Sequence, residues 1–345
     1  MGVTAFAKMT VVTRLGRPVD AKVSIVLCGY NQKAYLNDAI ASALSQTHRN
    51  LELIIIDNGS TDGSQELLKN YQADPRICLL LHSSNGAITK RLNEAIALSS
   101  GQYVSILYAD DYYLPHKLER QLQEFARLPP EYGVVYCPSY RIDARTGKRW
   151  VDKTLKQSGT ILKEMFLRHR DEGFINPISP LMRRECLIRY PFHEDVFVEG
   201  ESIFLRLALS YKFRYIDEPL TVMREHSSNM GKAIKINSVI ALTLLDKLSQ
   251  EPEFPPDLIA DLNAFRGYLM GTCGWLAIRM ATDPLWARAC LMSAIRWQPK
   301  QLFRLRTLAG LALSTLPVGG VRVFNKALNA MRAHKETIAF RADYT

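Results

Sequence analysis

The stretch from Leu51 to Gly63 reads LELIIIDNGSTDG and decides the fold of this chain. Its first half is an almost unbroken aliphatic run, which is typical of a strand buried on both faces of a parallel sheet. Its second half, from Asp57 onward, is a cluster of turn-forming residues. A strand that ends in a polar turn places functional groups at the carboxyl edge of a sheet, where ligands bind in α/β folds.

The same unit recurs along the first third of the chain. Apolar runs predict strands at residues 23–28, 51–56, 77–81 and 103–107, and helical spacing predicts helices at 33–46, 64–71 and 89–98. This alternation predicts an α/β fold with a mostly parallel sheet and helices on its faces. Three of the four strands end in polar clusters, at residues 29–31, 57–62 and 108–111. We expect these clusters to meet at one edge of the sheet.

The pattern changes in the second half of the chain. A strand is predicted at 133–137 and helices at 159–168 and 201–209. From residue 232 onward the pattern is helical, with helices predicted at 237–248, 256–280, 284–297, 301–313 and 321–332. The organisation predicted is a flexible lead-in at 1–20, an α/β domain at 21–230 and an all-helical C-terminal module at 232–345.

Composition narrows the class of protein. An apolar content of 47% excludes a disordered chain. A net charge of +10 suits nucleic acid, an anionic membrane or a polyanionic small substrate, but no pattern of a nucleic-acid-binding motif is present, so we expect no nucleic acid partner. The six cysteines are scattered without a Cys-x-x-Cys pair, which predicts buried free thiols in a reducing compartment.

Two features bear on location. Residues 1–17 lack the layout of a signal peptide, and the longest apolar stretch, at 308–318, is shorter than the roughly 20 residues that span a bilayer. We therefore expect a cytoplasmic protein, at most peripheral at the inner face of the membrane. The basic and Trp-containing helices of residues 232–345 fit either a membrane contact or the solvated face of a packed helical module.

Three blocks of the sequence together resemble the family 2 inverting glycosyltransferases: SIVLCGYN at residues 24–31, LIIIDNGSTDGS at 53–64 and YVSILYADD at 103–111. The resemblance covers about residues 20–230. It implies a GT-A fold with a nucleotide-binding half at 21–111 and an acceptor-binding half at 112–230. The activity implied is metal-dependent, inverting transfer of a sugar from a nucleotide-sugar donor to a saccharide, lipid-linked or other hydroxyl acceptor, in bacterial-type polysaccharide or glycoconjugate assembly.

The resemblance also implies which residues bind the nucleotide. Tyr30 and Asn31 match the loop that flanks the nucleobase, and Asp57 matches the carboxylate that binds the base edge. Without the resemblance, Asp57 is equally read as a turn-forming residue. Asn85 matches the segment between the third and fourth strands.

Two nearby residues carry further alternatives. Arg91, or Lys90 beside it, is placed to reach the diphosphate, although a basic residue on a helix is commonly just solvated. Asp62 is expected to cap the helix that begins near Ser64 instead of contacting the ligand.

The family's Asp-x-Asp motif falls on Tyr108-Ala109-Asp110, so tyrosine replaces the first aspartate. The resemblance then implies Asp110, with Asp111 in support, as ligands for Mn²⁺ or Mg²⁺ and for the donor diphosphate. One or two carboxylates suffice for such ions when phosphates supply further oxygens. His226 matches the histidine of the family's closing segment, as a third metal or phosphate ligand or as a structural residue.

The general base is expected just before a helix that contains Leu205-Arg206-Leu207. In the alignment on Arg206 the family's aspartate position is Gly200, with an acid on either side. Either Glu199 or Glu201 can supply the carboxylate, and flexibility at Gly200 favours Glu201. The alternative is that both glutamates only stabilise the helix N-terminus.

The departures at Tyr108 and Gly200 support a second hypothesis, a catalytically inactive glycosyltransferase-like protein that binds nucleotides or acts as a scaffold. A third hypothesis, nucleotidyl transfer, needs a glycine-rich phosphate loop after the first strand, and the turn Cys28-Gly29-Tyr30-Asn31 does not provide one.

Overall fold

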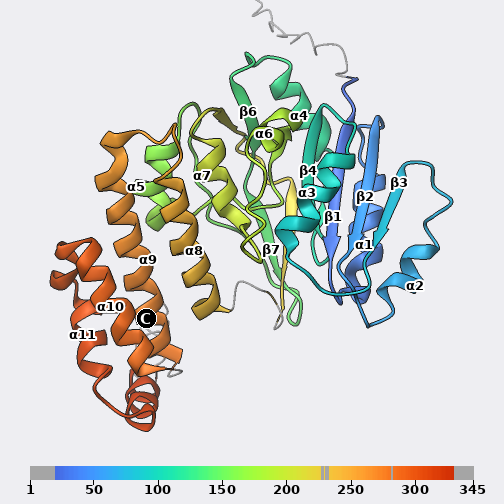
Figure 1. Cartoon of the computed structure of the whole chain (residues 1–345). Helices are drawn as coiled ribbons and strands as arrows, with labels where there is room; N and C mark the ends of the chain where they lie inside the picture. Colours follow the sequence, from blue (N-terminus) through green and yellow to red (C-terminus); the bar gives the residue numbers. More distant parts are fainter. Residues whose placement is uncertain (1–19, 227–228, 230–232, 281–282, 330–345) are drawn as a thin grey trace, which may run out of the picture.

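The computed structural model describes residues 20–226, 229, 233–280 and 283–329. All but the last residue of the predicted lead-in, residues 1–20, lies outside the described part. The α/β half of the chain occupies one side of the molecule, and the helices of the C-terminal part lie on the other (Figure 1).

The main sheet has seven strands in the order β10-β6-β9-β4-β1-β2-β3. Its parallel core consists of the four predicted strands, which are β1 (Val23–Gly29), β2 (Leu51–Asp57), β3 (Ile77–Leu81) and β4 (Tyr103–Tyr108). Beyond β4, the short strand β9 (Leu181–Arg183) is antiparallel to both β4 and β6 (Tyr132–Tyr136), and β10 (Lys212–Tyr215) completes the edge. The prediction of a mostly parallel sheet flanked by helices is confirmed.

Successive side chains of a central strand enter opposite cores. In β1, Ile25 and Leu27 join one buried cluster, and Val26 and Cys28 join the other. Helices α1 (Lys33–Leu44), α2 (Ser64–Lys69) and α4 (Lys117–Phe125) contribute to the first cluster, and α3 (Ile88–Leu98) contributes to the second. Because both faces are covered, most positions of these strands are apolar, and exceptions such as Ser24 and Ser105 are buried.

A second sheet of four strands has the order β5-β11-β7-β8. Its strands are β5 (Tyr112–Tyr113), β7 (Ser139–Asp143), β8 (Arg149–Val151) and β11 (Thr221–Glu225). Strand β11 is parallel to β7 and antiparallel to β5, and β8 is antiparallel to β7. Since β5 directly follows the turn after β4, this sheet is attached to the carboxyl edge of the main sheet.

Several helices connect and cover the second half of the α/β part. They are α5 (Leu162–Glu172), α6 (Arg184–Arg189) and α7 (Ile203–Leu207), the last preceded by a single 3-10 turn, η1 (Gly200–Ser202). The helix predicted at 201–209 is thus a 3-10 turn joined to one short helix, because Gly200 has a left-handed φ of 54° that an α-helix does not accommodate.

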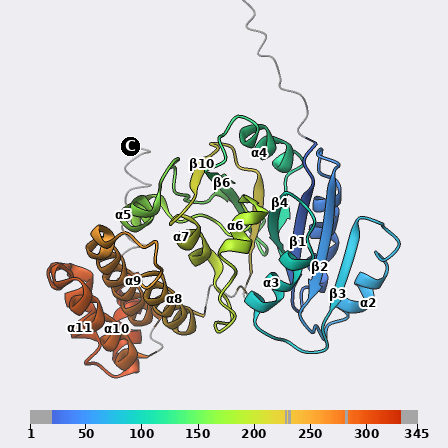
Figure 2. The ribbon, with the colours of Figure 1, turned by 45° about the horizontal axis from the view of Figure 1, so that its top comes forward.

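The C-terminal part is helical, as predicted. Its elements are α8 (Ile234–Leu248), η3 (Pro256–Leu258), α9 (Ile259–Met280), α10 (Pro284–Trp297), η4 (Pro299–Phe303) and α11 (Leu305–Leu313), followed by helical residues 318–329. The predicted extension of the last helix to residue 332 lies outside the described residues. Leu245 of α8 and Phe265 of α9 belong to the same buried cluster as Val26 of β1. Helices α8 and α9 accordingly lie beside α5 and α7 (Figure 2), whereas α10 and α11 are farther out.

All six cysteines are free thiols, as predicted. Cys28, Cys137, Cys186 and Cys290 are buried and Cys273 is half-buried, but the prediction of burial is wrong for Cys78, which is exposed. Cys78 lies on β3, the edge strand of the main sheet, where one face is not fully covered. Across the described ranges, every helix is too short or too polar to cross a membrane.

Candidate active site

The structure brings the three polar turns together at the carboxyl edge of the main sheet. The backbone N–H of Asn58 donates to the carbonyl of Gly29 at 2.9 Å, and that of Ala109 donates to the carbonyl of Cys28 at 3.0 Å. A Cβ on Gly29 would lie 2.6 Å from the Cβ of Ala109, so only glycine allows the first and third turns to approach this closely.

Asn31 joins the first turn to the second. Its backbone has a left-handed φ of 53°, its N–H donates to Oγ of Ser60 at 2.8 Å, and its side-chain Oδ1 accepts from the N–H of Thr61 at 2.8 Å. The neighbouring Tyr30 remains 40% exposed at the rim. Asn31 therefore fixes the loop, and Tyr30 is left to contact a ligand.

Asp57 ends β2 and is buried. One oxygen, Oδ1, accepts both the N–H of Ser60 at 2.8 Å and Nε2 of Gln65 at 2.7 Å. No donor among the described residues reaches the other oxygen, Oδ2. The two interpretations of Asp57 are thus compatible: one oxygen builds the turn, and the second remains for a ligand.

Asp62 connects the starts of two helices. Its Oδ1 accepts the N–H of Ser64 at 3.0 Å, and its Oδ2 accepts the N–H of Lys33 at 2.9 Å. Burial works to raise the pKa of Asp62, but the hydrogen bonds from Ser64 and Lys33 outweigh it and lower the pKa. The prediction that Asp62 caps the helix at Ser64 is confirmed, and it also holds the beginning of α1.

Asn58, which the sequence analysis did not single out, holds two of the predicted residues. Its Nδ2 donates to Oδ1 of Asn85 and to the carbonyl of Gly86, both at 2.8 Å. Its Oδ1 accepts the N–H of Gly86 and Nε of Arg91, both at 3.0 Å. Asn85 and Arg91 therefore lie beside the end of β2. The only sequence signal was an Asn-Gly turn, which does not reveal its partners.

Asp110 and His226 meet across the turn after β4. Nε2 of His226 lies 3.0 Å from Oδ2 of Asp110, and both side chains are largely buried. The imidazole ring stacks on Tyr35 of α1, with ring centroids 5.3 Å apart and planes 20° apart. His226 is therefore held against the acidic turn by residues from two elements.

Asp111 has a different role from Asp110. It is buried, and its Oδ1 accepts the N–H of Arg224 on β11 at 2.9 Å. Burial, reinforced by the charge of Asp110, raises its pKa well above the ordinary value. Asp111 therefore joins the second sheet to the acidic turn. Its Oδ1, which the prediction assigned to a metal, is bonded to the backbone of β11 instead.

Arg224 brings a positive charge to the same turn. Its Nη1 donates to the carbonyl of Asp110 at 3.0 Å, and its Nη2 pairs with Oδ2 of Asp38 at 2.5 Å. The guanidinium lies 5.2 Å from the ring centroid of Tyr35 and 4.8 Å from that of Tyr112. These contacts hold the guanidinium of Arg224 beside the acidic turn.

The predicted metal residues Asp110, Asp111 and His226 do not form a three-ligand cluster, and no group of three or more His, Cys, Asp or Glu suited to a metal ion occurs within the described ranges. The physical reason is the capture of Asp111 by β11. Asp110 and His226 remain as one carboxylate and one imidazole. That donor set fits a divalent ion that takes most of its oxygens from a diphosphate.

The two candidate bases have opposite environments, and Glu199 is the constrained one. It is buried, its Oε2 accepts the N–H of His193 at 2.7 Å, and its Oε1 lies 3.2 Å from Nη1 of Arg206. Burial raises the pKa of Glu199, and Arg206 opposes that shift. With both oxygens engaged, Glu199 supports the loop before α7.

Glu201 lies in η1 and is exposed to solvent. Desolvation by neighbouring protein atoms raises the pKa of Glu201 to about 7, with the charge of Arg141 working against the shift and that of Asp152 adding to it. Glu201 can therefore exchange a proton with a ligand at neutral pH.

Tyr108 connects Glu201 with the acidic turn. Burial raises its pKa, and the charges of Cys28, Asp110, Asp111 and Glu201 add to the shift. The negative charges of Asp110, Asp111 and Glu201 thus all disfavour ionisation of this phenol. Tyr108 remains protonated at neutral pH, so the residue at the family's first acidic position is a neutral hydrogen-bond donor.

Arg141 on β7 is the residue whose positive charge opposes the raised pKa of Glu201. Its Nε pairs with Oδ2 of Asp152 at 2.7 Å, and its Nη1 pairs with Glu225. Trp150 of β8 is directly opposite Arg141 in the antiparallel register, so the two side chains share one face of the sheet. Trp150 is 38% exposed. This face combines charged groups with an accessible indole.

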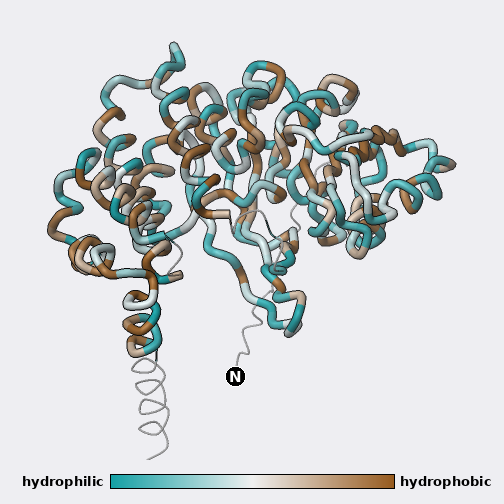
Figure 3. Tube along the Cα trace, turned by 60° about the horizontal axis from the view of Figure 1, so that its bottom comes forward, coloured by the Kyte–Doolittle hydropathy of each residue, from teal (hydrophilic) through white to brown (hydrophobic). Residues whose placement is uncertain are grey.

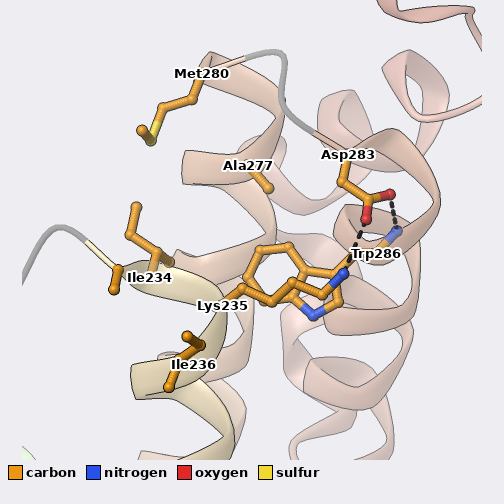
Figure 4. Close-up of a pocket in the computed structure, with 8 residues that line it drawn as sticks. Ile234, Lys235, Ile236, Ala277, Met280, Asp283 and Trp286 are labelled. Carbon is orange, nitrogen blue, oxygen red and sulfur yellow. Dashed lines mark hydrogen bonds and ion pairs between the residues drawn. The ribbon is translucent and has the colours of Figure 1, made fainter.

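A separate cavity of about 260 Å³ lies between α8, α9 and α10 (Figure 4). Ile234, Ile236, Ala277 and Met280 line it, and Lys235 spans it to pair with Asp283 at 3.1 Å. Because its charged residues neutralise each other, this cavity offers no chemistry comparable to the acidic turn.

Comparison with known proteins shows which family and which folds this chain is similar to. Residues 24–190 match the model of the family described as Glycosyl transferase family 2. An uncharacterized glycosyltransferase of Nostoc sp. is 29% identical over 222 residues, which are 60% of this chain and 66% of the relative. An uncharacterized glycosyltransferase of Rickettsia prowazekii is 36% identical over 124 residues, 36% of this chain and 38% of the relative. The chain thus spans less than two thirds of the length of either relative.

A third relative, TuaG of Bacillus subtilis, is named for teichuronic acid biosynthesis and is 36% identical over 102 residues, 29% of this chain and 40% of the relative. Among solved structures, Staphylococcus aureus TarS 1–349 with UDP has a TM-score of 0.59 at 14% identity, over 90% of this chain and 91% of TarS 1–349. The mannosyltransferase PcManGT of Pyrobaculum calidifontis, in complex with GDP-Man and Mn²⁺, has a TM-score of 0.54 at 17% identity, over 88% of this chain and 86% of PcManGT. These likenesses establish a shared GT-A-type fold.

Proposed function

We propose, from the match of residues 24–190 to the model of glycosyl transferase family 2, that the chain is a metal-dependent inverting glycosyltransferase. It moves a sugar from a nucleotide-sugar donor to a hydroxyl group of an acceptor. One observation carries the proposal: the strand-end turns meet at the carboxyl edge of the main sheet, where Oδ2 of Asp110 lies 3.0 Å from Nε2 of His226.

Glu201 is the proposed general base. In a single displacement the acceptor oxygen bonds to the anomeric carbon while the bond from that carbon to the diphosphate breaks, which inverts the configuration. The acceptor hydroxyl loses its proton in this step, and a carboxylate with a pKa of about 7 takes it efficiently at neutral pH. Glu199 is the weaker candidate, because Arg206 and His193 engage both of its oxygens.

Asp110 and His226 are the proposed protein ligands of Mn²⁺ or Mg²⁺, which neutralises the charge that develops on the departing nucleoside diphosphate. Arg224 lies beside Asp110 and Arg91 lies by the end of β2, so both are proposed to attract the diphosphate before transfer. The complex of PcManGT with GDP-Man and Mn²⁺ supports the expectation of a metal for this fold.

The nucleobase is proposed to lie between Tyr30 and Asp57. Oδ2 of Asp57 has no protein donor among the described residues and is free to accept an N–H from the base edge. Tyr30 is exposed beside it and offers an aromatic face. Asn31 and Asn85 act through the loops that they hold in place. The UDP complex of TarS supports a nucleotide ligand for this fold.

The acceptor is proposed to bind over the second sheet, on the face that carries Arg141 and Trp150. An exposed indole provides a flat surface for a sugar ring, and the Arg141–Asp152 pair provides hydrogen-bonding groups for hydroxyls. The relative TuaG supports a role in assembling a bacterial polysaccharide or glycoconjugate. The acceptor can be a saccharide, a lipid-linked molecule or another hydroxyl compound, and membrane contact is proposed only for the C-terminal helices.

The proposal is tested by a thermal-shift screen of nucleoside diphosphates and nucleotide sugars, with and without Mn²⁺. We expect one nucleotide series to raise the melting temperature, and Mn²⁺ to strengthen that effect. Asp110→Ala should abolish the Mn²⁺ enhancement. Asp171→Ala is the matched control, because Asp171 is an exposed aspartate on α5, remote from the acidic turn.

Turnover then separates the enzyme from its alternative. Slow hydrolysis of the best donor, or transfer to an added acceptor, supports the glycosyltransferase. Nucleotide binding without turnover across the donor panel supports the inactive nucleotide-binding or scaffold protein suggested by Tyr108 and Gly200. Retention of the Mn²⁺ effect in Asp110→Ala would remove the metal assignment.

A further inference from the structure

The outer C-terminal helices carry charge of a single sign. Residues 284–329 contain no aspartate or glutamate, and their seven basic residues are Arg288, Arg296, Lys300, Arg304, Arg306, Arg322 and Lys326. The net charge of the whole chain is +10, so this one segment supplies most of the excess. Such a field attracts polyanions and anionic surfaces.

Helix α11 faces solvent with an apolar side. It buries Thr307, Gly310 and Leu313 against the rest of the helical module. On the opposite side Leu305 is 81% exposed, and Leu308, one helical turn further on, is also exposed. A surface helix of a soluble protein normally presents polar residues in these positions. The outward side of α11 is therefore an exposed apolar side, which is unusual for a helix that faces only water.

The same surface continues into the preceding turn η4. Phe303 is 83% exposed and directly precedes Arg304. Lys300 and Arg306, both exposed, flank the apolar side chains. The close mixture of hydrophobic and polar positions on these outer helices is visible along the Cα trace (Figure 3). We call Lys300, Phe303, Arg304, Leu305, Arg306 and Leu308 the η4–α11 surface.

Helix α10 repeats the combination. It buries Ala287, Leu291 and Ala294, whereas Leu285 and Met292 are exposed on its outer side together with Arg288 and Arg296. Exposed large apolar side chains ringed by cations match the boundary between lipid tails and anionic headgroups. A protein that bound this surface would need a face that is both acidic and apolar, because residues 284–329 contain no acid. An anionic membrane meets both needs with its headgroups and its lipid tails.

We propose that the η4–α11 surface docks on membranes that contain anionic phospholipids. Phe303, Leu305 and Leu308 enter the headgroup boundary, and Lys300, Arg304 and Arg306 bind the phosphates. Because α8 and α9 share a buried core with the α/β part, docking would hold the acidic turn at a fixed distance from the membrane. This proposal does not depend on catalysis, and either proposal can fail alone.

Co-sedimentation of the full chain with vesicles tests it. Binding to vesicles of phosphatidylcholine and phosphatidylglycerol should exceed binding to phosphatidylcholine alone by at least about tenfold, since each basic residue near the surface contributes to attraction. The pair Arg304→Glu and Arg306→Glu should remove most of this preference. The pair Phe303→Ser and Leu305→Ser should lower binding to anionic vesicles by about tenfold or more.

The control is Leu98→Ser with Ile188→Ser, two exposed apolar residues on the α/β part, and it should bind like the wild type. Melting temperatures confirm that every variant is folded. Equal recovery with both vesicle types would overturn the proposal. So would self-association that the Phe303→Ser and Leu305→Ser pair abolishes, without vesicle binding, because the surface would then join two copies of the chain.

Discussion

Nη1 of Arg206 lies 3.2 Å from Oε1 of Glu199, and this contact distinguishes Glu199 from Glu201, which is only two residues further along the chain. Arg206 also pairs with Glu251 at 3.1 Å, so Glu199 belongs to a buried ion network that joins the loop before α7 to the C-terminal part. Glu199→Gln should therefore lower the free energy of unfolding by about 3 kcal/mol, since Arg206 loses one of its two carboxylates. Urea unfolding measures the change.

The Glu199→Gln variant should retain turnover per folded molecule within about threefold, because the buried pair holds structure and transfers no proton. Glu185→Gln, at an exposed glutamate of α6, should change neither quantity. A variant at 199 with unaltered stability and abolished turnover would exchange the roles of Glu199 and Glu201.

Glu201 should set the pH dependence of transfer. A general base acts when deprotonated, and desolvation raises the pKa of Glu201 to about 7, so kcat/KM should rise with pH and level off above that value. An unshifted glutamate would give a plateau down to about pH 5. Glu201→Gln should lower kcat by about 10²- to 10⁴-fold and abolish the acidic limb, while donor binding in the thermal-shift assay persists.

Asp111 also has a raised pKa, so it needs its own control. Asp111→Asn should keep the limb near pH 7, because Asp111 is buried and bonded to the backbone of Arg224, whereas Glu201 is exposed. Loss of the limb in Asp111→Asn but not in Glu201→Gln would show that Asp111 governs the titration.

The parallel core of the fold was predictable because burial on both faces favours mostly apolar runs, and β1, β2 and β4 follow that pattern with exceptions such as the buried Ser24 and Ser105. The second sheet was not predictable. Strand β7 contains Tyr140, Arg141 and Asp143, whose polarity reflects an ion-paired surface and not a buried strand. Strand β9 has only three residues, too few to show a period, and it lies between strands that are distant in the chain.

The position of a turn in the candidate site was predictable where it depends only on the direction of the strand before it. Parallel strands end at one edge, so the turns at Asp57 and Asp110 had to converge. The choice between Glu199 and Glu201 was not predictable, because it depends on which carboxylate Arg206 reaches in three dimensions. The four side-chain hydrogen bonds of Asn58 depend on the loop after β3 and on Arg91 of α3, so they were not predictable for the same reason.

Trp150 should govern the acceptor and not the donor. Trp150→Ala should raise the KM for a saccharide acceptor by about tenfold, the equivalent of roughly 1.4 kcal/mol, and leave the KM for the donor unchanged. The control is Val151→Ala, since Val151 is the next residue of β8, is also exposed and points to the opposite face. Initial-rate kinetics with each substrate varied in turn distinguish the two. Equal effects of both variants would remove Trp150 from the acceptor site.

Lys117 should make stability depend on pH. It is fully buried at the start of α4, its Nζ donates to Oγ of Ser105 at 2.7 Å, and it lies 4.3 Å from the ring centroid of Tyr113. No carboxylate within the described part of the chain forms an ion pair with it. Burial lowers the pKa of Lys117 from 10.5 to about 7, so the folded chain holds a neutral amine above that pH.

The unfolded chain keeps this lysine protonated up to its ordinary pKa, so between pH 7 and 10.5 it binds more protons than the folded chain does. The free energy of unfolding should consequently rise with pH above 7, by up to about 1.4 kcal/mol per unit. The buried thiols, whose raised pKa acts in the opposite direction above about pH 9, leave a clear window from about pH 7 to 8.5. Lys117→Met should flatten the slope in this window and raise stability at pH 7 by about 2 kcal/mol. Lys69→Met, at an exposed lysine of α2, should preserve the slope, and an unchanged slope in Lys117→Met would show that Lys117 stays charged in the fold.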